Sequence, residues 1–541
     1  MIDAVSQLLN ELGLSVLAAL GPYVLSFLVL LPVAAAVVVA LTRREAEGAQ
    51  KLIGLVSTTG VFLVSLALLS GFRNTAEMQF QEMRPWIPAA GIAYHLGLDG
   101  LSLWLVILTT FLTPLCVLGS WTSIRTRVRE FVVLMLLLEA GMIGVFVALD
   151  LFLFYVFWEA MLIPMYFLIG IWGHERRIYA AVKFFLYTFA GSVLMLVAFL
   201  VLYRTSGIGS FDLEALARAP VDPALQMWLF AACALAFAIK VPMFPFHTWL
   251  PDAHVEAPTA GSVILAGVLL KMGGYGFLRL AIPLFPDAAV RFAPWIGVLA
   301  VIGIVYGALV SLVQPDLKKL VAYSSVSHLG FVMLGIAALS TTSVVGAVYQ
   351  MLNHGISTGA LFFMVGMLYD RRHTRTIAEF GGLKAVMPWY AAVFLLVCLS
   401  SIAVPGFNGF VGEFLILMGS WGFSPGLVSL ATLGVILAAA YVLWMVKRVL
   451  YGEATNPKNA GLPDLSPREG AVLVPLVALA LFMGVASPLF TRSIEPAANN
   501  LILQVRQRVR GSPEGGTARG AGFTPIRGQA RVASPGGDTR A

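Results

Sequence analysis

The sequence predicts an all-α polytopic membrane protein of about 14 transmembrane helices, with two inverted five-helix repeats that each contain a broken helix. Three observations support this fold class. Of the 541 residues, 59% are apolar and only 12% are charged, whereas charged residues make up about 25% of a soluble domain. Apolar runs recur along the chain at the length of roughly 20 residues that crosses a bilayer. Prolines interrupt two of these runs at matching places in the two halves.

Fourteen apolar runs approach the length of a transmembrane helix. They lie near residues 23–41, 52–71, 99–121, 130–148, 150–172, 179–203, 224–248, 258–282, 292–313, 318–339, 342–369, 387–420, 426–447 and 470–490. Pro242 and Pro245 interrupt the run at 224–248, and Pro405 interrupts the run at 387–420. Because proline lacks the amide hydrogen of a helical hydrogen bond, we expect both helices to be broken there.

Lysine and arginine in the connections predict the orientation, because these residues concentrate on the cytoplasmic side. One side carries seventeen of them: Arg43, Arg44, Lys51, Arg125, Arg127, Arg129, Arg176, Arg177, Lys318, Lys319, Arg371, Arg372, Arg375, Lys384, Arg448, Lys458 and Arg468. The other side carries five before the tail: Arg73, Arg84, Arg204, Arg218 and Arg291. We therefore predict a multi-pass protein of a bacterial inner membrane, with the first side in the cytoplasm and the N-terminus outside.

The repeats define the predicted domains. Residues 1–129 hold the N-terminal segment and three spans, 130–282 the first five-helix repeat and 292–447 the second. Residues 448–490 hold a loop and the last span, and the Arg/Gly/Pro-rich tail at 491–541 is predicted to be disordered. Since five is odd, the second repeat has the opposite topology. Broken helices in inverted repeats are typical of secondary transporters, whose site lies near the membrane midplane.

The charge distribution argues against nucleic-acid binding, and the cysteine spacing argues against metal clusters and disulfides. The net charge is +7, but eight arginines against three acidic residues in the tail supply +5 of it. Only +2 remains over residues 1–490, so we expect no surface for nucleic acid. Cys116, Cys233 and Cys398 form no CxxC pair, so we expect no iron–sulfur cluster, no metal site and no disulfide framework.

A charge within a predicted span costs about 2.5–3.5 kcal/mol and therefore indicates a partner or a function, and six such ionisable residues are candidates for a relay. They are Glu159, Lys240, Lys271, His328, His354 and Glu413. Their spread across the spans suits a lateral proton relay, because burial disfavours the charged form and lets such groups exchange protons near neutral pH. We expect the breaks at Pro242 and Pro405 to expose backbone groups and admit water beside this relay.

Five further residues are predicted to support the relay: Glu139, His247, Tyr323, Ser324 and Ser325. Structural interpretations stay open for several of these residues. Glu159 and Lys240 could be an ion pair that only holds the bundle together, and either relay histidine could be a hydrogen-bonded core residue. Glu139 could pair with a neighbouring chain, and the three hydroxyl residues could join helices or bind water. His247 and His254 fit a polar helix end better than a metal site.

Three motifs resemble those of a known family. They are Phe157-Trp158-Glu159 with Pro164-Met165-Tyr166, the stretch from Lys240-Val241-Pro242 to Leu250-Pro251-Asp252-Ala253-His254, and Pro258-Thr259-Ala260-Gly261-Ser262. Over residues 90–490 the chain resembles the antiporter-like family, which comprises the large proton-pumping subunits of respiratory complex I, multisubunit Na⁺/H⁺ antiporters and membrane hydrogenases. Glu413 stands where most relatives carry Lys, which favours a complex I member.

The resemblance implies that the chain moves protons and holds no cofactor or redox centre itself. Other subunits would pass electrons from NADH to quinone through FMN and iron–sulfur clusters. The partners would be the other membrane subunits of complex I, including neighbouring antiporter-like subunits, within the lipid bilayer. Glu159 and Lys240 would form a modulating ion pair, and Lys271 would be the central carrier. His328 and His354 would conduct laterally, and Glu413 would pass the proton outward.

Two other functions remain open from the sequence. A subunit of a Na⁺/H⁺ antiporter or membrane hydrogenase would use the same residues without NADH oxidation. A structural membrane subunit would use the charges only to hold helices together. Two mid-membrane lysines, one of them beside a break, argue against the structural role.

Overall fold

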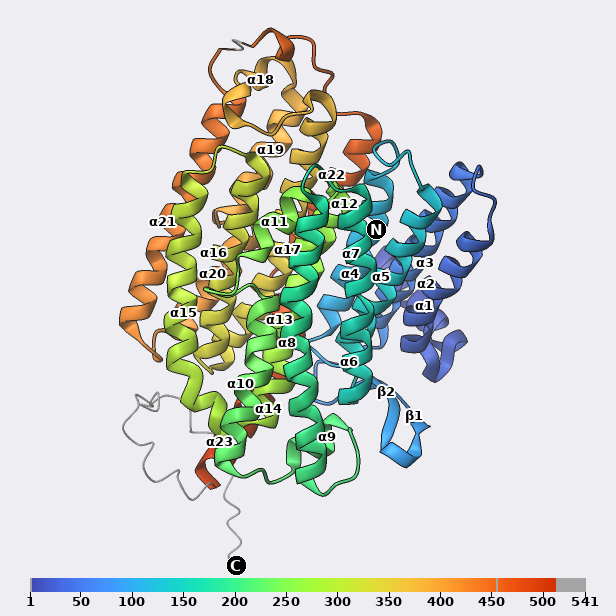
Figure 1. Cartoon of the computed structure of the whole chain (residues 1–541), viewed down its shortest axis with the longest axis vertical. Coiled ribbons are helices and arrows are strands. Elements are labelled where there is room, and N and C mark those ends of the chain that lie inside the picture. The colour runs from blue at the N-terminus through green and yellow to red at the C-terminus, as the bar shows by residue number, and fades with distance from the viewer. Residues whose placement is uncertain (1, 454–455, 512–541) are drawn as a thin grey trace, which may run out of the picture.

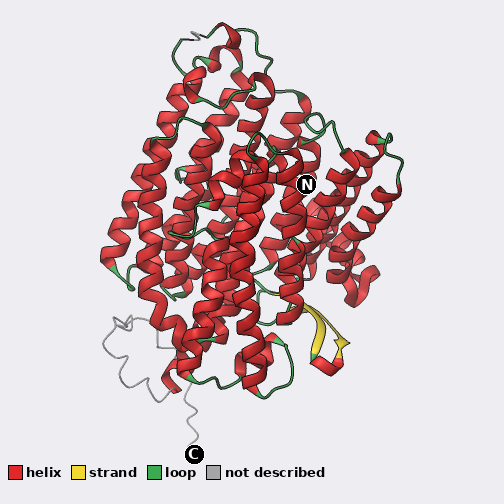
Figure 2. Ribbon diagram, viewed as in Figure 1, coloured by secondary structure: helices red, strands yellow, loops and turns green. Residues whose placement is uncertain are grey.

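In the computed structural model, the chain is a bundle of helices that run along the longest axis of the molecule, with one short β-hairpin (Figures 1 and 2). The structure describes residues 2–453 and 456–511. Within these residues, twelve helices are long and apolar enough to cross a membrane, and the apolar helices Leu103–Gly119 and Pro388–Ser401 are shorter. The predicted class, a helical multi-pass membrane protein, is therefore confirmed.

The N-terminal part contains four helices and the hairpin. These are α1 (Ile2–Leu20), α2 (Val24–Leu41), α3 (Glu47–Gly71), β1 (Gln79–Ile87), β2 (Ile92–Leu98) and α4 (Leu103–Gly119). The antiparallel hairpin was not predicted. Buried Glu82 of β1 accepts hydrogen bonds from the backbone amides of Leu25 and Ser26, at 2.7 and 3.0 Å. These amides at the start of α2 have no partner within the helix, so the hairpin caps α2.

Residues 128–284 form the next group of helices. These are α5 (Val128–Val147), α6 (Leu151–Ala160), α7 (Leu162–Trp172), α8 (Arg177–Ser206), α9 (Leu213–Arg218), α10 (Pro223–Lys240), α11 (Trp249–Glu256), α12 (Thr259–Ile264), α13 (Leu270–Gly276) and α14 (Ile282–Leu284). The π-helical turns Leu265–Leu269 and Phe277–Ala281 join α12, α13 and α14 into one span. Such turns are frequent at functional sites.

Residues 286–511 form the last group. These are α15 (Pro286–Leu312), α16 (Leu317–Ala337), α17 (Thr341–Arg372), α18 (Leu383–Val386), α19 (Pro388–Ser401), α20 (Asn408–Ser420), α21 (Pro425–Leu450), α22 (Pro467–Val485) and α23 (Pro488–Gly511). Capping boxes start two of them, Ser340 with Ser343 at α17 and Ser466 with Glu469 at α22. Each box satisfies amides that the first helical turn leaves unpaired.

The helices are broken at both predicted places. Residues 241–248 separate α10 from α11, and residues 402–407 separate α19 from α20. In the second break, Ala403 and Gly406 have φ angles of 57° and 95°. Glycine adopts such angles at little cost, and Pro405 prevents the helix from continuing. Both breaks leave helix ends inside the bundle, where backbone groups are free to bind side chains or water.

The basic connections gather at one end of the bundle, which we call the basic end. Hydrogen bonds join the connections that follow α2, α4, α7, α15, α17 and α21. Lys51 donates to the carbonyl of Trp121 at 2.9 Å, and Lys318 donates to the carbonyl of Ala257, at the end of α11, at 2.6 Å. The hairpin and α9 lie at the opposite end (Figure 1). Fixed cations at the C-terminal end of α11 also offset its helix dipole.

The prediction of disorder over residues 491–541 is wrong for its first part. Helix α23 extends to Gly511, and residues 512–541 lie outside the described residues. Ile494, Ala498, Leu501 and Val505 are buried and recur every three or four residues, so one face of an amphipathic helix packs on the bundle. The Arg/Gly/Pro content averaged over the whole tail concealed this face.

Candidate functional site

Five of the six predicted relay residues are buried inside the bundle. Their exposed fractions are 1% for Lys240, 0% for Lys271, 3% for His328 and His354, and 4% for Glu413. They come from α10, α13, α16, α17 and α20, so the fold brings together residues from both halves of the chain. The sixth, Glu159, is partly exposed near the end of α6.

Lys271 and His354 are in direct contact. The Lys271 Nζ lies 2.7 Å from the His354 Nδ1. The same amine donates to the carbonyl of Ala266, which belongs to the π-helical turn before α13. Because the amine carries two or three hydrogens and a neutral imidazole has one accepting nitrogen, this contact can hold one shared proton.

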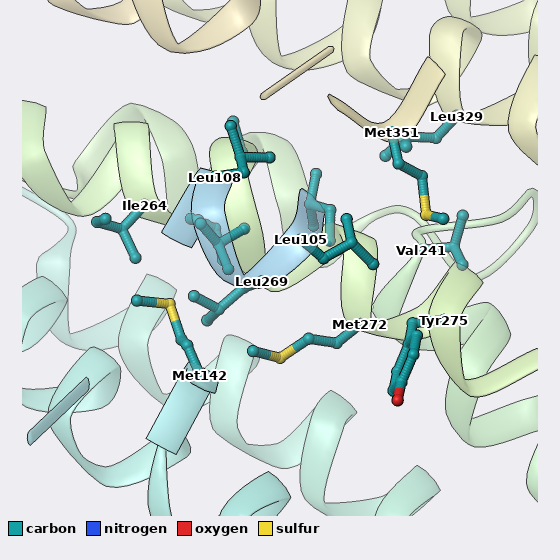
Figure 3. Packing of buried hydrophobic residues seen from close by; sticks show 14 of the residues in the cluster. Leu105, Leu108, Met142, Val241, Ile264, Leu269, Met272, Tyr275, Leu329 and Met351 are labelled. Carbon is teal, nitrogen blue, oxygen red and sulfur yellow. The ribbon is translucent and has the colours of Figure 1, made fainter. Parts of the chain in front are cut away.

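Apolar side chains enclose the span that carries Lys271. Figure 3 shows Ile264, Leu269 and Met272 of this span among Leu105 and Leu108 of α4, Met142 of α5, Leu329 of α16 and Met351 of α17. Every residue in the most apolar stretch of this span is buried. In such a medium a charge interacts with its neighbours far more strongly than in water.

His328 and Glu413 form the second contact. The His328 Nδ1 lies 3.0 Å from the Glu413 Oε1, and the Tyr441 hydroxyl lies 3.3 Å from the His328 Nε2. Gln350 Nε2 donates to the same Glu413 oxygen at 3.1 Å. The His328 and His354 ring centres are 6.2 Å apart. Lys271, His354, His328 and Glu413 therefore form one string, which we call the buried string.

Lys240 lies apart from the buried string, and its predicted ion pair with Glu159 is not formed in the structure. The Lys240 Nζ lies 5.3 Å from the Trp158 ring centre and 5.7 Å from that of Phe184. Neither the Lys240 Nζ nor the Glu159 Oε1 has a hydrogen-bond partner among the described residues. The two aromatic rings stabilise the ammonium group by cation–π interactions, while the Glu159 carboxylate acts on it electrostatically without direct contact.

Gly273 brings the first break close to Lys271. A Cβ atom at this position would lie 2.6 Å from the Phe237 carbonyl and 2.8 Å from the Val241 amide nitrogen. Only a glycine lets α13 approach the end of α10 this closely. The break after Lys240 therefore packs directly against the helix that carries Lys271.

The five residues predicted to support the relay differ in their contacts. Ser324 and Ser325 both donate to the Val321 carbonyl of their own helix, and the Ser324 hydroxyl also interacts with the Tyr441 hydroxyl of α21. Hydroxyl groups in apolar helices satisfy themselves in this way. Glu139 is 0% exposed, so pairing with a neighbouring chain is excluded, and neither carboxylate oxygen has a partner among the described residues. His247 is buried and its ring lies 6.4 Å from that of Tyr323.

The sequence analysis missed two contributors to the site. His254 is fully buried and stacks on Phe362 with ring centres 4.6 Å apart, and neither ring nitrogen has a partner among the described residues. It lies within electrostatic range of Lys271. Gln350 binds Glu413 directly. The signal for His254 was its position before an apolar span, which was interpreted as a polar helix end. Within the described residues no group of three or more His, Cys, Asp or Glu could hold a metal ion.

Titratable residues in contact across the buried middle of a membrane bundle are typical of ion-translocating membrane proteins. Two family matches specify the class further. Residues 148–438 match the NADH:quinone oxidoreductase/Mrp antiporter transmembrane family, and residues 50–144 match the amino terminus of NADH-ubiquinone oxidoreductase chain 4. The chain belongs to the NADH:quinone oxidoreductase/Mrp antiporter family.

Individual relatives agree with this family. The NADH-quinone oxidoreductase subunit M of Rhodobacter capsulatus is 50% identical over 494 residues, which cover 88% of this chain and 96% of that protein. A chain of respiratory complex I from Thermus thermophilus is 35% identical with a TM-score of 0.83, over 89% of this chain and 99% of that chain. A chain of the Mrp complex from Dietzia has a TM-score of 0.79 at 21% identity, over 90% and 99%. This last similarity concerns the fold alone.

Proposed function

We propose that this chain is a proton-translocating membrane subunit of NADH:quinone oxidoreductase, of the subunit M type, in a bacterial inner membrane. The observation that carries the proposal is the buried string from Lys271 through His354 and His328 to Glu413. The 50% identity to the Rhodobacter subunit over nearly all of both chains supports the assignment to this enzyme.

The buried string supports proton transfer in three steps. Lys271 gives its proton to the Nδ1 of His354, which lies 2.7 Å away. His354 passes a proton to His328 across the gap between rings whose centres are 6.2 Å apart, a gap that one water molecule or a ring rotation can bridge. His328 gives its proton to Glu413 through the 3.0 Å contact. Each step moves one proton between groups that alternate between two protonation states.

Lys240 and Glu159 supply the control of this transfer. With its ammonium over Trp158, Lys240 has no carboxylate in contact and lies beside the helix that carries Lys271. A charge at Lys240 disfavours a second charge at Lys271, because the medium between them is apolar. Closing the Glu159–Lys240 pair would screen this repulsion and let Lys271 take up a proton.

We also propose a number of spans and an orientation for this chain in the membrane. The twelve long helices, the short helix α4 and the broken helix formed by α19 and α20 would make fourteen spans. The two breaks would lie in inverted five-helix repeats. The basic end would face the cytoplasm and the N-terminus the outside, because lysine and arginine gather on the cytoplasmic side.

Partner subunits would supply the redox chemistry. Electrons would pass from NADH to quinone through FMN and iron–sulfur clusters in those subunits, and charge movement there would drive the Glu159–Lys240 pair electrostatically. An exchanger of Na⁺ and H⁺ would use the same string without NADH. The Mrp likeness, at 21% identity, supports only the shared fold.

Lys271→Met tests the proposal. In inverted vesicles that contain the assembled complex, we expect NADH-driven acidification and NADH:quinone turnover to fall by at least about tenfold, because a proton carrier is lost. Lys319→Met is the matched control, since Lys319 is exposed at the basic end. Unchanged turnover and acidification in Lys271→Met would contradict proton transfer through Lys271, and Na⁺/H⁺ exchange would then be measured.

A further inference from the structure

Glu413 has a second polar neighbourhood besides His328. Gln350 Nε2 donates to the Glu413 Oε1 at 3.1 Å, and Asn353 Nδ2 donates to the Gln350 Oε1 at 3.0 Å. The same Asn353 amide donates to the Asn408 carbonyl at 2.8 Å, at the start of α20. An unbroken row of uncharged polar groups thus leads from Glu413 to the second break.

The row continues on the other side of the break. Ser400 Oγ donates to the Asn408 Oδ1 at 2.6 Å, and the Ser357 and Ser400 hydroxyls are 2.6 Å apart. Yet the Asn408 Nδ2 and the Asn353 Oδ1 have no partner among the described residues, although these residues are only 0% and 1% exposed. Buried amide groups without a protein partner are normally satisfied by ordered water.

A cavity opens beside these hydroxyls, which we call the inner cavity. It has room for about one water molecule. Ser357 of α17 and Ser400 of α19 are its polar lining residues, and the others are apolar: Ile356, Ala360, Leu396, Val397, Phe407, and Leu476, Val477 and Ala480 of α22. Ser400, which lines this cavity, also donates to the Asn408 side chain, so water in the cavity would lie one hydroxyl away from Asn408.

A second cavity lies further along α17 and α22, at the basic end. Met367 and Asp370 of α17 and Arg468, Glu469 and Val472 of α22 line it, and it also has room for about one water molecule. On α17, residues 360, 363, 367 and 370 fall on one stripe at intervals of three or four residues, as residues 469, 472, 476 and 480 do on α22. Both cavities therefore border one seam between α17 and α22. Residues of α19 also line the inner cavity, and Gly119, Ser123 and Thr259 also line the second one.

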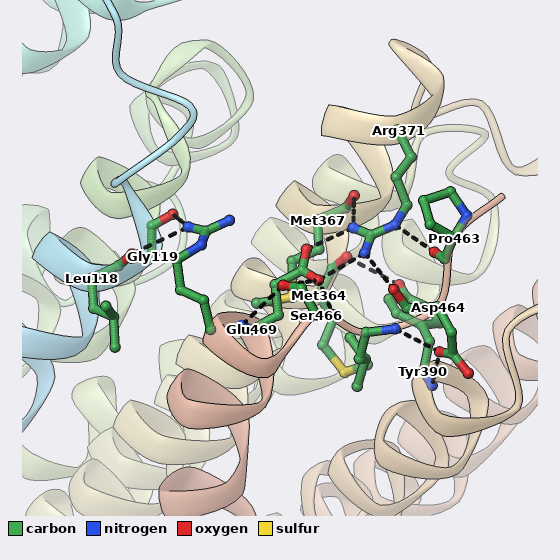
Figure 4. Close-up of polar contacts among 12 residues, drawn as sticks. Leu118, Gly119, Met364, Met367, Arg371, Tyr390, Pro463, Asp464, Ser466 and Glu469 are labelled. Atoms are coloured by element: carbon green, nitrogen blue, oxygen red, sulfur yellow. Dashed lines mark hydrogen bonds and ion pairs between the residues drawn. The ribbon is translucent and has the colours of Figure 1, made fainter.

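A bidentate ion pair fixes this seam at the basic end. The Arg371 guanidinium donates to both Glu469 oxygens at 2.7 Å and to the carbonyls of Met367, Pro463 and Asp464 (Figure 4). Arg468 turns away from it toward the carbonyls of Leu118 and Gly119. The pair holds the two helices in register, and the cavities lie at a fixed interface.

We propose that the seam between α17 and α22 is a water-filled route by which Glu413 takes up protons from the basic end, independently of Lys271 and His354. This inference rests on the proposed function, in which Glu413 carries protons. Water in the inner cavity and at Asn408 carries the proton, and the amides and hydroxyls orient that water. Phe363, which lines the second cavity, lies about one helical turn, about 5 Å, along α17 from Ala360 of the inner cavity, and its ring closes the route when no water is present.

Filling the inner cavity tests the route. Ala360→Leu and Ala480→Leu place extra carbon atoms in the space for water and leave every polar group of the route unchanged. We expect both to lower NADH-driven acidification of the assembled complex several-fold. Val474→Leu is the matched control, because Val474 lies on α22 with 61% of its side chain exposed and should leave acidification unchanged.

Two further measurements test the route even if the leucine variants fail to assemble. Ser357→Ala and Ser400→Ala remove hydroxyls without adding volume and should also slow acidification. A high-resolution map of the complex should show water density in the inner cavity, and density of a lipid tail or an empty cavity there would overturn the route. Glu413→Gln is measured in parallel. If Glu413→Gln impairs acidification while the assembled Ala360→Leu and Ala480→Leu complexes acidify normally, the route is rejected and the proposed function stands. If it has no effect either, the proposed function fails as well.

Discussion

Lys271 and His354 illustrate how single residues limit the charge of the buried string. Two positive charges 2.7 Å apart in an apolar medium would repel each other strongly, so only one of the two groups is charged at a time. The His354 Nε2 has no partner among the described residues, which leaves it able to pass a proton toward His328. A pair that holds one proton at a time is suited to a relay step.

His174 gives a prediction for pH dependence. It lies in the connection between α7 and α8, outside the spans, and burial together with the nearby charges of Lys318 and Arg375 lowers its pKa from 6.5 to about 4. The stabilising effect of neutral His174 is therefore complete above pH 6.5 and is lost as the pH falls toward 4. Between pH 7 and pH 5 the melting temperature of the wild-type complex should fall more than that of His174→Gln. An equal fall in the melting temperatures of the two complexes would contradict a neutral, buried His174.

Sequence alone singled out most of the buried titratable residues of the candidate site, but neither His254 nor the contacts between them. Lys271 and Glu413 stand out because charges in apolar spans are rare. The cation–π environment of Lys240 could not be predicted, because it depends on how α6, α8 and α10 pack. His254 was missed for the same reason, since only the packing of α11 against α17 reveals that it is buried.

At the level of elements, the contact between α10 and α13 decides how close the two lysines lie. Gly273→Ala would place a Cβ 2.6 Å from the Phe237 carbonyl, so α13 must move away from α10. We expect NADH-driven acidification to fall several-fold while the complex still assembles. Gly170→Ala is the control, because its Cβ would meet nothing closer than 3.7 Å. Similar rates of acidification in the Gly273→Ala and Gly170→Ala complexes would show that proton transfer does not need the close contact between α10 and α13.

The ion pair between α17 and α22 gives a second prediction at this level. Arg371 and Glu469 are 10% and 8% exposed, and removing one partner of such a pair costs about 3–5 kcal/mol. Arg371→Ala should therefore lower the melting temperature of the purified complex markedly. Arg371→Lys keeps the charge but loses the bidentate geometry and should fall between that variant and the wild type. A melting temperature unchanged by Arg371→Ala would contradict the clamp.

The breaks could be predicted from sequence, whereas the hairpin and α23 could not. Proline and glycine mark a break directly, since they remove a hydrogen bond or favour a left-handed backbone. The hairpin at Gln79–Leu98 lies between spans in a stretch without a regular alternation of apolar and polar residues. Helix α23 is short of apolar residues overall, and only their spacing at Ile494, Ala498, Leu501 and Val505 indicates it.

For the whole molecule, the buried string runs from one half of the chain to the other. Lys240 and Lys271 come from the first half, and His328, His354 and Glu413 come from the second. The contact between Lys271 and His354 joins the halves. Within the buried string, a disturbance at the first break therefore reaches Glu413 through this junction. Sequence could assign the residues to halves, but the junction depends on packing between segments that are 83 residues apart.

The most direct test of proton transfer through the buried string is the number of protons pumped per NADH oxidised by the Glu413→Gln complex. Glutamine keeps the shape of the side chain but cannot carry a proton, so the last step of the string is lost. In inverted vesicles with verified assembly, we expect the number of protons pumped per NADH oxidised to fall relative to the wild type. An unchanged ratio of protons to NADH at unchanged turnover would contradict transfer through the string.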